Sequence, residues 1–247
     1  MPGSALVAIE FYCEPTSENN YPLLSIEFVE LYRPVAWHGF EAALMEDDMP
    51  QTPSNVIELG TQAAEFILPD ADGNLHRLSD FDGTSALLVA FISNRCPFVL
   101  LLREQLAAFG REYLPKGLQI VAINSNDAEA HPEETLSRIG DEVRLVGYPF
   151  PYLKDASQSV AQAYGAACTP DFFLFDAKRQ LAYHGQFDDA RPKNGKEVTG
   201  ADLRAAADAL LDGGVPRAEQ TQSIGCNIKW TPGNEPSAFE NSGSKAA

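Results

Sequence analysis

The strongest constraint on the fold is the apolar run Ala86–Ser93, which leads at once into Asn94-Arg95-Cys96-Pro97. A continuous apolar run indicates a strand that is covered on both faces. Pro97 suits the first turn of a helix, and apolar residues at helical spacing continue to Tyr113. The run therefore predicts a buried strand that passes directly into a helix.

The rest of the chain from about residue 59 has a similarly regular pattern. Two hairpins, a second buried strand and three further helices are predicted. The hairpins pair Ala64–Leu68 with Leu75–Leu78 and Phe172–Phe175 with Leu181–His184, and the strand is Leu118–Asn124. The helices are Pro132–Val143, Ser157–Tyr164 and a last one that is capped by Thr199-Gly200-Ala201-Asp202 and runs through Leu211. This order predicts an α/β fold with a central mixed β-sheet flanked by helices on both faces, in which ligands lie at the carboxyl ends of strands.

Composition limits the partners of the chain. Its 247 residues carry a net charge of −17, which repels nucleic acid and anionic membranes, so neither is expected as a partner. The four cysteines are too few and too scattered for a disulfide framework or a zinc site. The first residues lack the basic region of a signal peptide, and no apolar run is long enough to cross a membrane. We therefore expect a cytoplasmic protein that needs no cofactor or metal.

The chain divides into three parts by pattern. Residues 1–50 are acidic, show no sustained period and are predicted to be a peripheral extension; the first 48 could also reflect a wrongly chosen start codon. Residues 51–230 form the regular domain. The tail 231–247 is rich in Gly, Pro, Ser and Asn and is predicted to be disordered.

Cys96 is the main candidate for chemistry. At a helix N-terminus, free backbone N–H groups and partial positive charge lower a thiol pKa, and Arg95 adds a neighbouring cation. The alternative is a small buried core residue. Ser93 lies three positions earlier, where its hydroxyl could donate to the Cys96 thiolate or to a bound peroxide oxygen, or could simply cap the turn.

Three further positions are candidates on other segments. Thr169-Pro170 precedes a central strand and is a candidate cis peptide that would leave backbone groups free to pair with an extended substrate. Cys168 could resolve an oxidised Cys96 or could be a packed small residue. Cys226 is a second, weaker candidate for a resolving thiol, since sequence alone cannot show that it reaches Cys96. Cys13 receives no role, and the four scattered histidines would form a Cys–His dyad or a metal site only through contacts that the sequence does not show.

The motifs together resemble a known family. Phe66-Ile67-Leu68-Pro69-Asp70, Asn94-Arg95-Cys96-Pro97-Phe98-Val99, Thr169-Pro170-Asp171-Phe172, Asp188-Asp189-Ala190-Arg191-Pro192 and Gly225-Cys226-Asn227-Ile228-Lys229-Trp230 follow in order. This set is similar to the peroxiredoxin-like proteins of the alkyl hydroperoxide reductase/thiol-specific antioxidant branch of the thioredoxin-like superfamily. The resemblance implies a thioredoxin-like fold with an added N-terminal β-hairpin, an active-site Cys96 and a cis-proline at Pro170 that faces it.

The sequence also departs from the family pattern. Many relatives of this subgroup carry Cys-x-x-Cys where this chain has Ser93-Asn94-Arg95-Cys96, so dithiol exchange within one loop is not available. Ser93-x-x-Cys96 fits the Thr/Ser-x-x-Cys element of peroxiredoxins, although Val89 replaces their upstream proline. Their catalytic arginine has no assured counterpart.

Three functions remain open at this point. The first is an antioxidant oxidoreductase that reduces hydroperoxides through a Cys96 sulfenic acid, regenerated by Cys168, Cys226 or an external thiol such as a thioredoxin or glutathione. The second is thiol-disulfide exchange on a protein partner held along Thr169-Pro170. The third is a thioredoxin-fold binding module without turnover.

Overall fold

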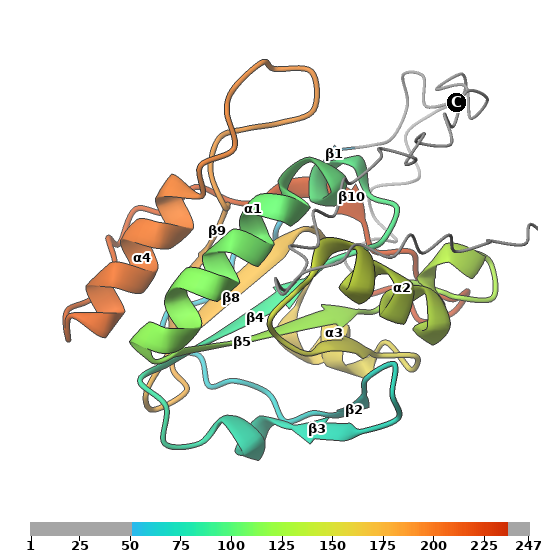
Figure 1. Cartoon of the computed structure of the whole chain (residues 1–247), viewed down its shortest axis with the longest axis horizontal. Coiled ribbons are helices and arrows are strands. Elements are labelled where there is room, and N and C mark those ends of the chain that lie inside the picture. The colour runs from blue at the N-terminus through green and yellow to red at the C-terminus, as the bar shows by residue number, and fades with distance from the viewer. Residues whose placement is uncertain (1–50, 237–247) are drawn as a thin grey trace, which may run out of the picture. The chain divides into compact units, whose positions relative to one another are not determined.

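The computed structural model of this chain describes residues 51–236 (Figure 1). The predicted extension 1–50 and the tail from residue 237 lie outside the described residues. Within the predicted tail, Asn234 donates to Gln158 and its carbonyl accepts from Gln162, so ordered contacts extend at least to that residue. None of the helices in 51–236 combines the length and the hydrophobicity that a membrane span requires.

The described region consists of short strands and helices that alternate along the chain. The strands are β1 (Gln51–Pro53), β2 (Ile67–Pro69), β3 (Leu75–Arg77), β4 (Ala86–Phe91), β5 (Leu118–Asn124), β6 (Tyr152–Lys154), β7 (Cys168–Thr169), β8 (Asp171–Asp176), β9 (Leu181–Gly185) and β10 (Ile224–Asn227). The α-helices are α1 (Pro97–Tyr113), α2 (Leu136–Val146), α3 (Ser159–Tyr164) and α4 (Ala201–Leu211), and the 3₁₀ turns are η1 (Leu78–Phe81), η2 (Leu114–Lys116) and η3 (Pro132–Glu134).

The central sheet has five strands in the order β6-β5-β4-β8-β9. Strands β4, β5 and β6 are parallel to one another, whereas β8 is antiparallel to β4 and β9 is antiparallel to β8. The predicted mixed sheet is therefore confirmed. Strand β4 lies at its centre and every one of its residues is buried, which explains its continuous apolar sequence.

Helices cover both faces of this sheet (Figure 1). Alternate β4 side chains such as Leu88 and Ala90 pack with α1, α2 and α4, while Leu87 and Val89 pack with α3 and the β2–β3 hairpin. Helix α1 starts directly after the carboxyl end of β4, so its N-terminus lies at the edge of the sheet where ligands of such folds bind.

Most predicted elements match the observed ones, and one helix is wrong. The predicted helix Pro132–Val143 is split, because Thr135 adopts an extended conformation between the 3₁₀ turn η3 and helix α2. The short strands β1, β6, β7 and β10 are absent from the prediction. Three of them, β1, β10 and β7, form a second sheet beside Cys96.

Candidate active site

Cys96 is the N-cap residue of α1, and Pro97 occupies the first turn as predicted. Backbone N–H groups at a helix N-terminus have no partner within the helix, so the thiol sits where negative charge is favoured. The side chain is buried, with only 2% of its surface exposed. Burial therefore raises the pKa of this thiol, whereas the helix terminus lowers it.

The Thr169–Pro170 peptide bond is cis, which confirms the prediction for this position. The carbonyl oxygen of Thr169 lies 2.9 Å from the Cys96 sulfur, within reach of the thiol proton. The β7–β8 junction that carries this bond is thus directly beside the cysteine, although 73 positions separate Thr169 from Cys96.

Strand β10 covers the same junction. It pairs antiparallel with β7, with Cys226 opposite Thr169 and Asn227 opposite Cys168, and on its other edge with β1. The prediction that backbone groups at Thr169 are free for an extended substrate is therefore wrong, since the chain's own strand already pairs with them.

Strand β10 brings a second thiol to Cys96. The Cys226 sulfur lies 2.9 Å from the Cys96 sulfur, and both cysteines are free and buried. Closing a disulfide between two sulfurs in contact needs only a small further approach, toward the ~2.05 Å of an S–S bond. Cys226, the weaker of the two resolving candidates in the sequence, is thus the one in direct contact.

Gly225 makes this approach possible. A Cβ atom at this position would lie 2.0 Å from the carbonyl oxygen of Thr169, well inside van der Waals contact. Only a residue without a side chain lets β10 lie this close to the cis-peptide junction. The glycine immediately before Cys226 therefore permits the close approach of β10 that brings Cys226 to Cys96.

The hydrogen bond between the two thiols shifts the pKa of each in opposite directions. Burial raises the pKa of Cys96, but hydrogen bonds from the Cys226 thiol and the Thr169 side chain, with the backbone N–H of Val99 in the first turn of α1, lower that pKa to about 6. The hydrogen bond to Cys96, together with burial, raises the pKa of Cys226 far above that of a free thiol. The pair therefore loses its first proton early, from Cys96, and retains its second on Cys226.

Cys168 lies on β7 and is completely buried. Its sulfur is 3.6 Å from the carbonyl oxygen of Pro170, and no hydrogen bond joins it to the Cys96 sulfur within the described region. Burial and the charge of Asp171 raise the pKa of Cys168 well above the usual value. Of the two candidate resolving thiols, Cys226 is thus the one in contact with the Cys96 sulfur.

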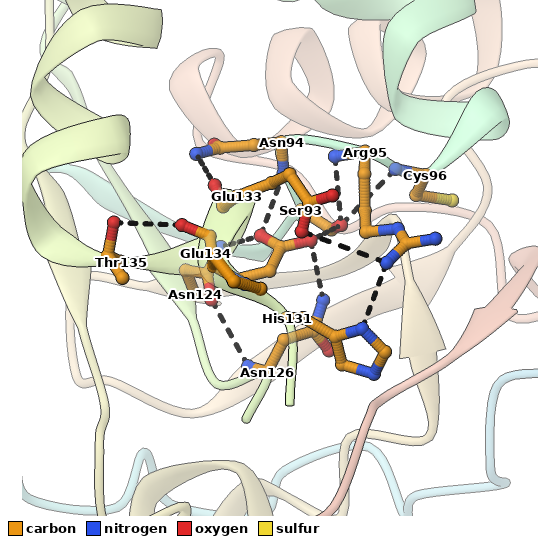
Figure 2. A network of polar contacts seen from close by, with 11 residues as sticks. Ser93, Asn94, Arg95, Cys96, Asn124, Asn126, His131, Glu133, Glu134 and Thr135 are labelled. Carbon is orange, nitrogen blue, oxygen red and sulfur yellow. Dashed lines mark hydrogen bonds and ion pairs between the residues drawn. The ribbon is translucent and has the colours of Figure 1, made fainter. Parts of the chain in front are cut away.

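Ser93 caps the turn before α1 and does not donate a hydrogen bond to the Cys96 sulfur. Its hydroxyl donates to Glu134 at 2.6 Å, and its oxygen accepts from the backbone N–H groups of Cys96 at 3.2 Å and Arg95 at 3.3 Å (Figure 2). A hydroxyl has one proton, so in this arrangement none is directed at the Cys96 sulfur. Figure 2 shows that sulfur pointing away from Ser93.

The Arg95 guanidinium contacts His131 and Glu133 within the described residues. Its Nη1 lies 2.9 Å from Nδ1 of His131 and 3.8 Å from a carboxylate oxygen of Glu133 (Figure 2). The lowered pKa of Cys96 therefore comes chiefly from Cys226, Thr169 and the helix terminus, rather than from the neighbouring cation that the sequence suggested.

The other polar motifs form local structure. Asp188 accepts backbone N–H groups of Ala190, Thr199 and Gly200. The buried His184 and Asp171 side chains form a hydrogen bond, with Nε2 lying 2.8 Å from a carboxyl oxygen. Across residues 51–236, no group of three or more His, Cys, Asp or Glu side chains has the arrangement of a metal site.

The sequence pattern of the Redoxin family matches residues 58–202, more than half of the chain. The chain belongs to the Redoxin family. It is an oxidoreductase with a thioredoxin-like fold, which confirms the resemblance to a peroxiredoxin-like member of that superfamily.

Three known proteins are similar to this chain in sequence or in fold. The thiol-disulfide oxidoreductase ResA of Halalkalibacterium halodurans is 30% identical over 127 residues, which are 51% of this chain and 68% of the relative. A hypothetical protein from Sinorhizobium meliloti 1021 has a structure with TM-score 0.73 and 69% identity, covering 74% of this chain and 100% of that chain. A Chlorobium tepidum structure, assigned as a thiol:disulfide interchange protein DsbE, shares the fold with TM-score 0.51 and 23% identity, over 63% of this chain and 99% of that one.

Two residues at the site were missed by sequence reasoning. Glu134 gives no signal in the sequence beyond an acidic residue after a proline, yet it contacts a loop 41 positions earlier. Gly225 could have been noticed as a glycine directly before a cysteine in an apolar segment, but the surface it approaches is visible only in the fold.

Proposed function

We propose that this Redoxin-family protein catalyses thiol-disulfide exchange, with Cys96 as the attacking thiol and Cys226 as the thiol that completes the reaction. The observation that carries the proposal is the 2.9 Å contact between the two sulfurs. It supplies from a distant strand the partner that Ser93 does not provide within the loop. The ResA relatives, which are thiol-disulfide oxidoreductases by name, support the same reaction class.

The reaction proceeds in two exchanges. The Cys96 thiolate attacks one sulfur of a substrate disulfide, which forms a mixed disulfide and releases the other substrate sulfur as a thiolate. Cys226 loses its proton and attacks the Cys96 sulfur, so that a Cys96–Cys226 bond forms and the second substrate sulfur leaves with the electron pair and takes up a proton. The substrate is reduced by two electrons and the two cysteines are oxidised.

The return step needs an external dithiol or two thiols, which reduce the Cys96–Cys226 disulfide by the reverse exchanges. A thioredoxin or glutathione is the predicted reductant, and the cytoplasmic location also stays a prediction. The same cycle runs in the oxidative direction when the protein meets a dithiol substrate in its oxidised state. Its direction depends on the potential of the Cys96–Cys226 pair relative to its partners.

Hydroperoxide reduction is the second candidate. The observation that favours it is the limited access of large substrates to the Cys96 thiol. Cys96 is only 2% exposed, and β10 already pairs with the strand edge at Thr169. A small oxidant reaches such a thiol more easily than an extended polypeptide does. Cys96 would become a sulfenic acid with release of an alcohol or water, and Cys226 would then form the disulfide with loss of water.

The two functions are separated by turnover assays on one preparation. We would measure reduction of bis(2-hydroxyethyl) disulfide, of insulin and of hydrogen peroxide by the wild type and by Cys96→Ser, Cys226→Ser and Cys168→Ser. The proposal predicts disulfide turnover that requires Cys96 and Cys226. Peroxide turnover that exceeds disulfide turnover would support the second candidate, and a dependence on Cys168 in place of Cys226 would refute the assigned pair.

A further inference from the structure

Glu134 is a completely buried carboxylate that the reaction above does not use. Its Oε1 accepts from the Ser93 hydroxyl at 2.6 Å and the Asn126 side chain at 3.1 Å, and its Oε2 accepts from the Asn124 side chain at 2.6 Å and the Asn94 backbone N–H at 3.1 Å (Figure 2). Within residues 51–236, no cationic side chain forms an ion pair with it. Four donors thus offset the cost of burying its charge.

One set of these bonds holds the segment that carries Cys96. Because the Ser93 proton is directed to Glu134, the Ser93 oxygen is left to accept the Cys96 backbone N–H. The Asn94 N–H bonds to the carboxylate directly. Glu134 therefore fixes the backbone of the loop on which the Cys96 sulfur sits.

A second set reaches the segment that carries Cys226. The Asn126 side chain donates to Glu134 with Nδ2 and accepts the Lys229 backbone N–H at Oδ1, at 2.8 Å. The neighbouring Asp127 N–H donates to the Lys229 carbonyl at 2.7 Å. Lys229 lies three residues after Cys226, just beyond the end of β10. The strand that brings Cys226 to the site is thus held through Asn126 by the same carboxylate.

We infer that Glu134 is a positioning residue for the redox pair, which sets the separation of the Cys96 and Cys226 sulfurs by holding both segments. The inference rests on the proposed function for its relevance to turnover. It concerns the internal step, in which Cys226 attacks the Cys96 sulfur. Loss of the carboxylate lets the two segments move independently and so lowers the effective concentration of one thiol at the other.

The test measures the equilibrium of the internal disulfide without a substrate. Wild-type protein, Glu134→Gln and the exposed α1 control Glu104→Gln are equilibrated with mixtures of oxidised and reduced dithiothreitol. The reaction is stopped with acid, and mass spectrometry of linked peptides gives the fraction of Cys96–Cys226 disulfide. In Glu134→Gln an NH₂ donor replaces one of the two acceptor oxygens and faces other donors. The hydrogen bonds to the Cys96 segment and to the Cys226 segment therefore weaken. We expect the equilibrium constant for disulfide formation to fall about tenfold or more, the scale of lost hydrogen bonds to a charged group.

Asn126→Ala separates positioning from general loss of structure, and it remains informative if Glu134→Gln does not fold. This change removes the Asn126 donor to Glu134 and the acceptor of the Lys229 N–H, and it leaves the Ser93 and Asn94 bonds to Glu134 in place. Asn126→Ala should lower the equilibrium constant of disulfide formation. The pH dependence of Cys96 alkylation is measured separately in a Cys226→Ala background. There, the protein with Asn126→Ala should show the same pH dependence as the protein that retains Asn126. The inference is overturned if Asn126→Ala and any folded Glu134→Gln form the disulfide as readily as the wild type. Because no substrate takes part, failure of the proposed turnover does not alter this readout.

Discussion

The sulfurs of Cys96 and Cys226 lie 2.9 Å apart although 130 positions separate the two residues in the chain. The first sulfur belongs to the N-cap residue of α1, just after the central strand β4, and the second belongs to a strand outside the central sheet. The pair of thiols that the proposed reaction needs is thus brought together by tertiary structure.

The first prediction concerns the pH dependence of Cys96. Alkylation of Cys96 by iodoacetamide should rise with pH around a midpoint near 6, since only the thiolate reacts and its pKa is lowered to about 6. Cys226→Ala removes the first of the hydrogen bonds that stabilise the thiolate, so the midpoint should move up toward the ~8.5 of a free thiol. Peptide mapping at a series of pH values measures both midpoints.

Cys168→Ala is the matched control for that experiment. The Cys168 thiol remains protonated in the relevant range, because burial raises its pKa well above the usual value. Its removal should leave the Cys96 midpoint in place. A Cys96 midpoint near the ~8.5 of a free thiol in the wild type, or one that responds to Cys168 and not to Cys226, would contradict the assigned proton sharing.

The second prediction concerns Gly225. A Cβ at this position would lie 2.0 Å from the Thr169 carbonyl oxygen, so Gly225→Ala should push β10 away from β7. Cys96 then becomes more accessible, and its alkylation at alkaline pH should accelerate at least several-fold while the internal disulfide becomes harder to form. Insulin reduction, if β10 blocks extended substrates, should improve relative to that of a small disulfide.

Gly214→Ala serves as the control, because its Cβ would meet only the Ala209 carbonyl oxygen at 3.2 Å, near the end of α4. It should alter neither alkylation nor the substrate ratio. If Gly225→Ala leaves Cys96 as protected as in the wild type, the close packing of β10 on the Thr169–Pro170 junction does not control access.

The third prediction concerns stability. Ser93→Ala leaves the Cys96 backbone N–H without its acceptor and removes one of the four donors to Glu134. Loss of a buried hydrogen bond to a charged group costs about 1–3 kcal/mol, so the free energy of unfolding in urea should fall by about that amount. Ser137→Ala, at an exposed position of α2, should change it by less than about 0.5 kcal/mol. Equal unfolding curves for the two variants would mean that Ser93 does not secure the loop.

The sequence was most informative where a single local pattern determines the structure. The buried run Ala86–Ser93 and the Cys96-Pro97 cap predicted β4 and the start of α1, and Thr169-Pro170 was recognised as a cis candidate. These features depend on residues close together in the chain, where helix capping and proline geometry leave few alternatives.

The parts that could not be predicted depend on contacts between distant segments. Strands β7 and β10 have two and four residues, too few to show a period, and their pairing covers the edge that seemed free at Thr169. Arg95 neighbours Cys96 in sequence, yet its guanidinium contacts His131, which lies 36 positions later in the chain. Glu134 likewise acquires its role from segments around residues 93, 126 and 229 that only the fold brings together.

The most direct test of the account is to identify the disulfide formed during the reaction. Reduced protein would be mixed with one equivalent of bis(2-hydroxyethyl) disulfide, stopped with acid after a short interval, alkylated and digested for mass spectrometry. The account predicts a transient mixed disulfide on Cys96 that gives way to a peptide pair linking Cys96 with Cys226. A Cys96–Cys168 link, or a mixed disulfide on Cys96 that persists until external thiol is added, would contradict it.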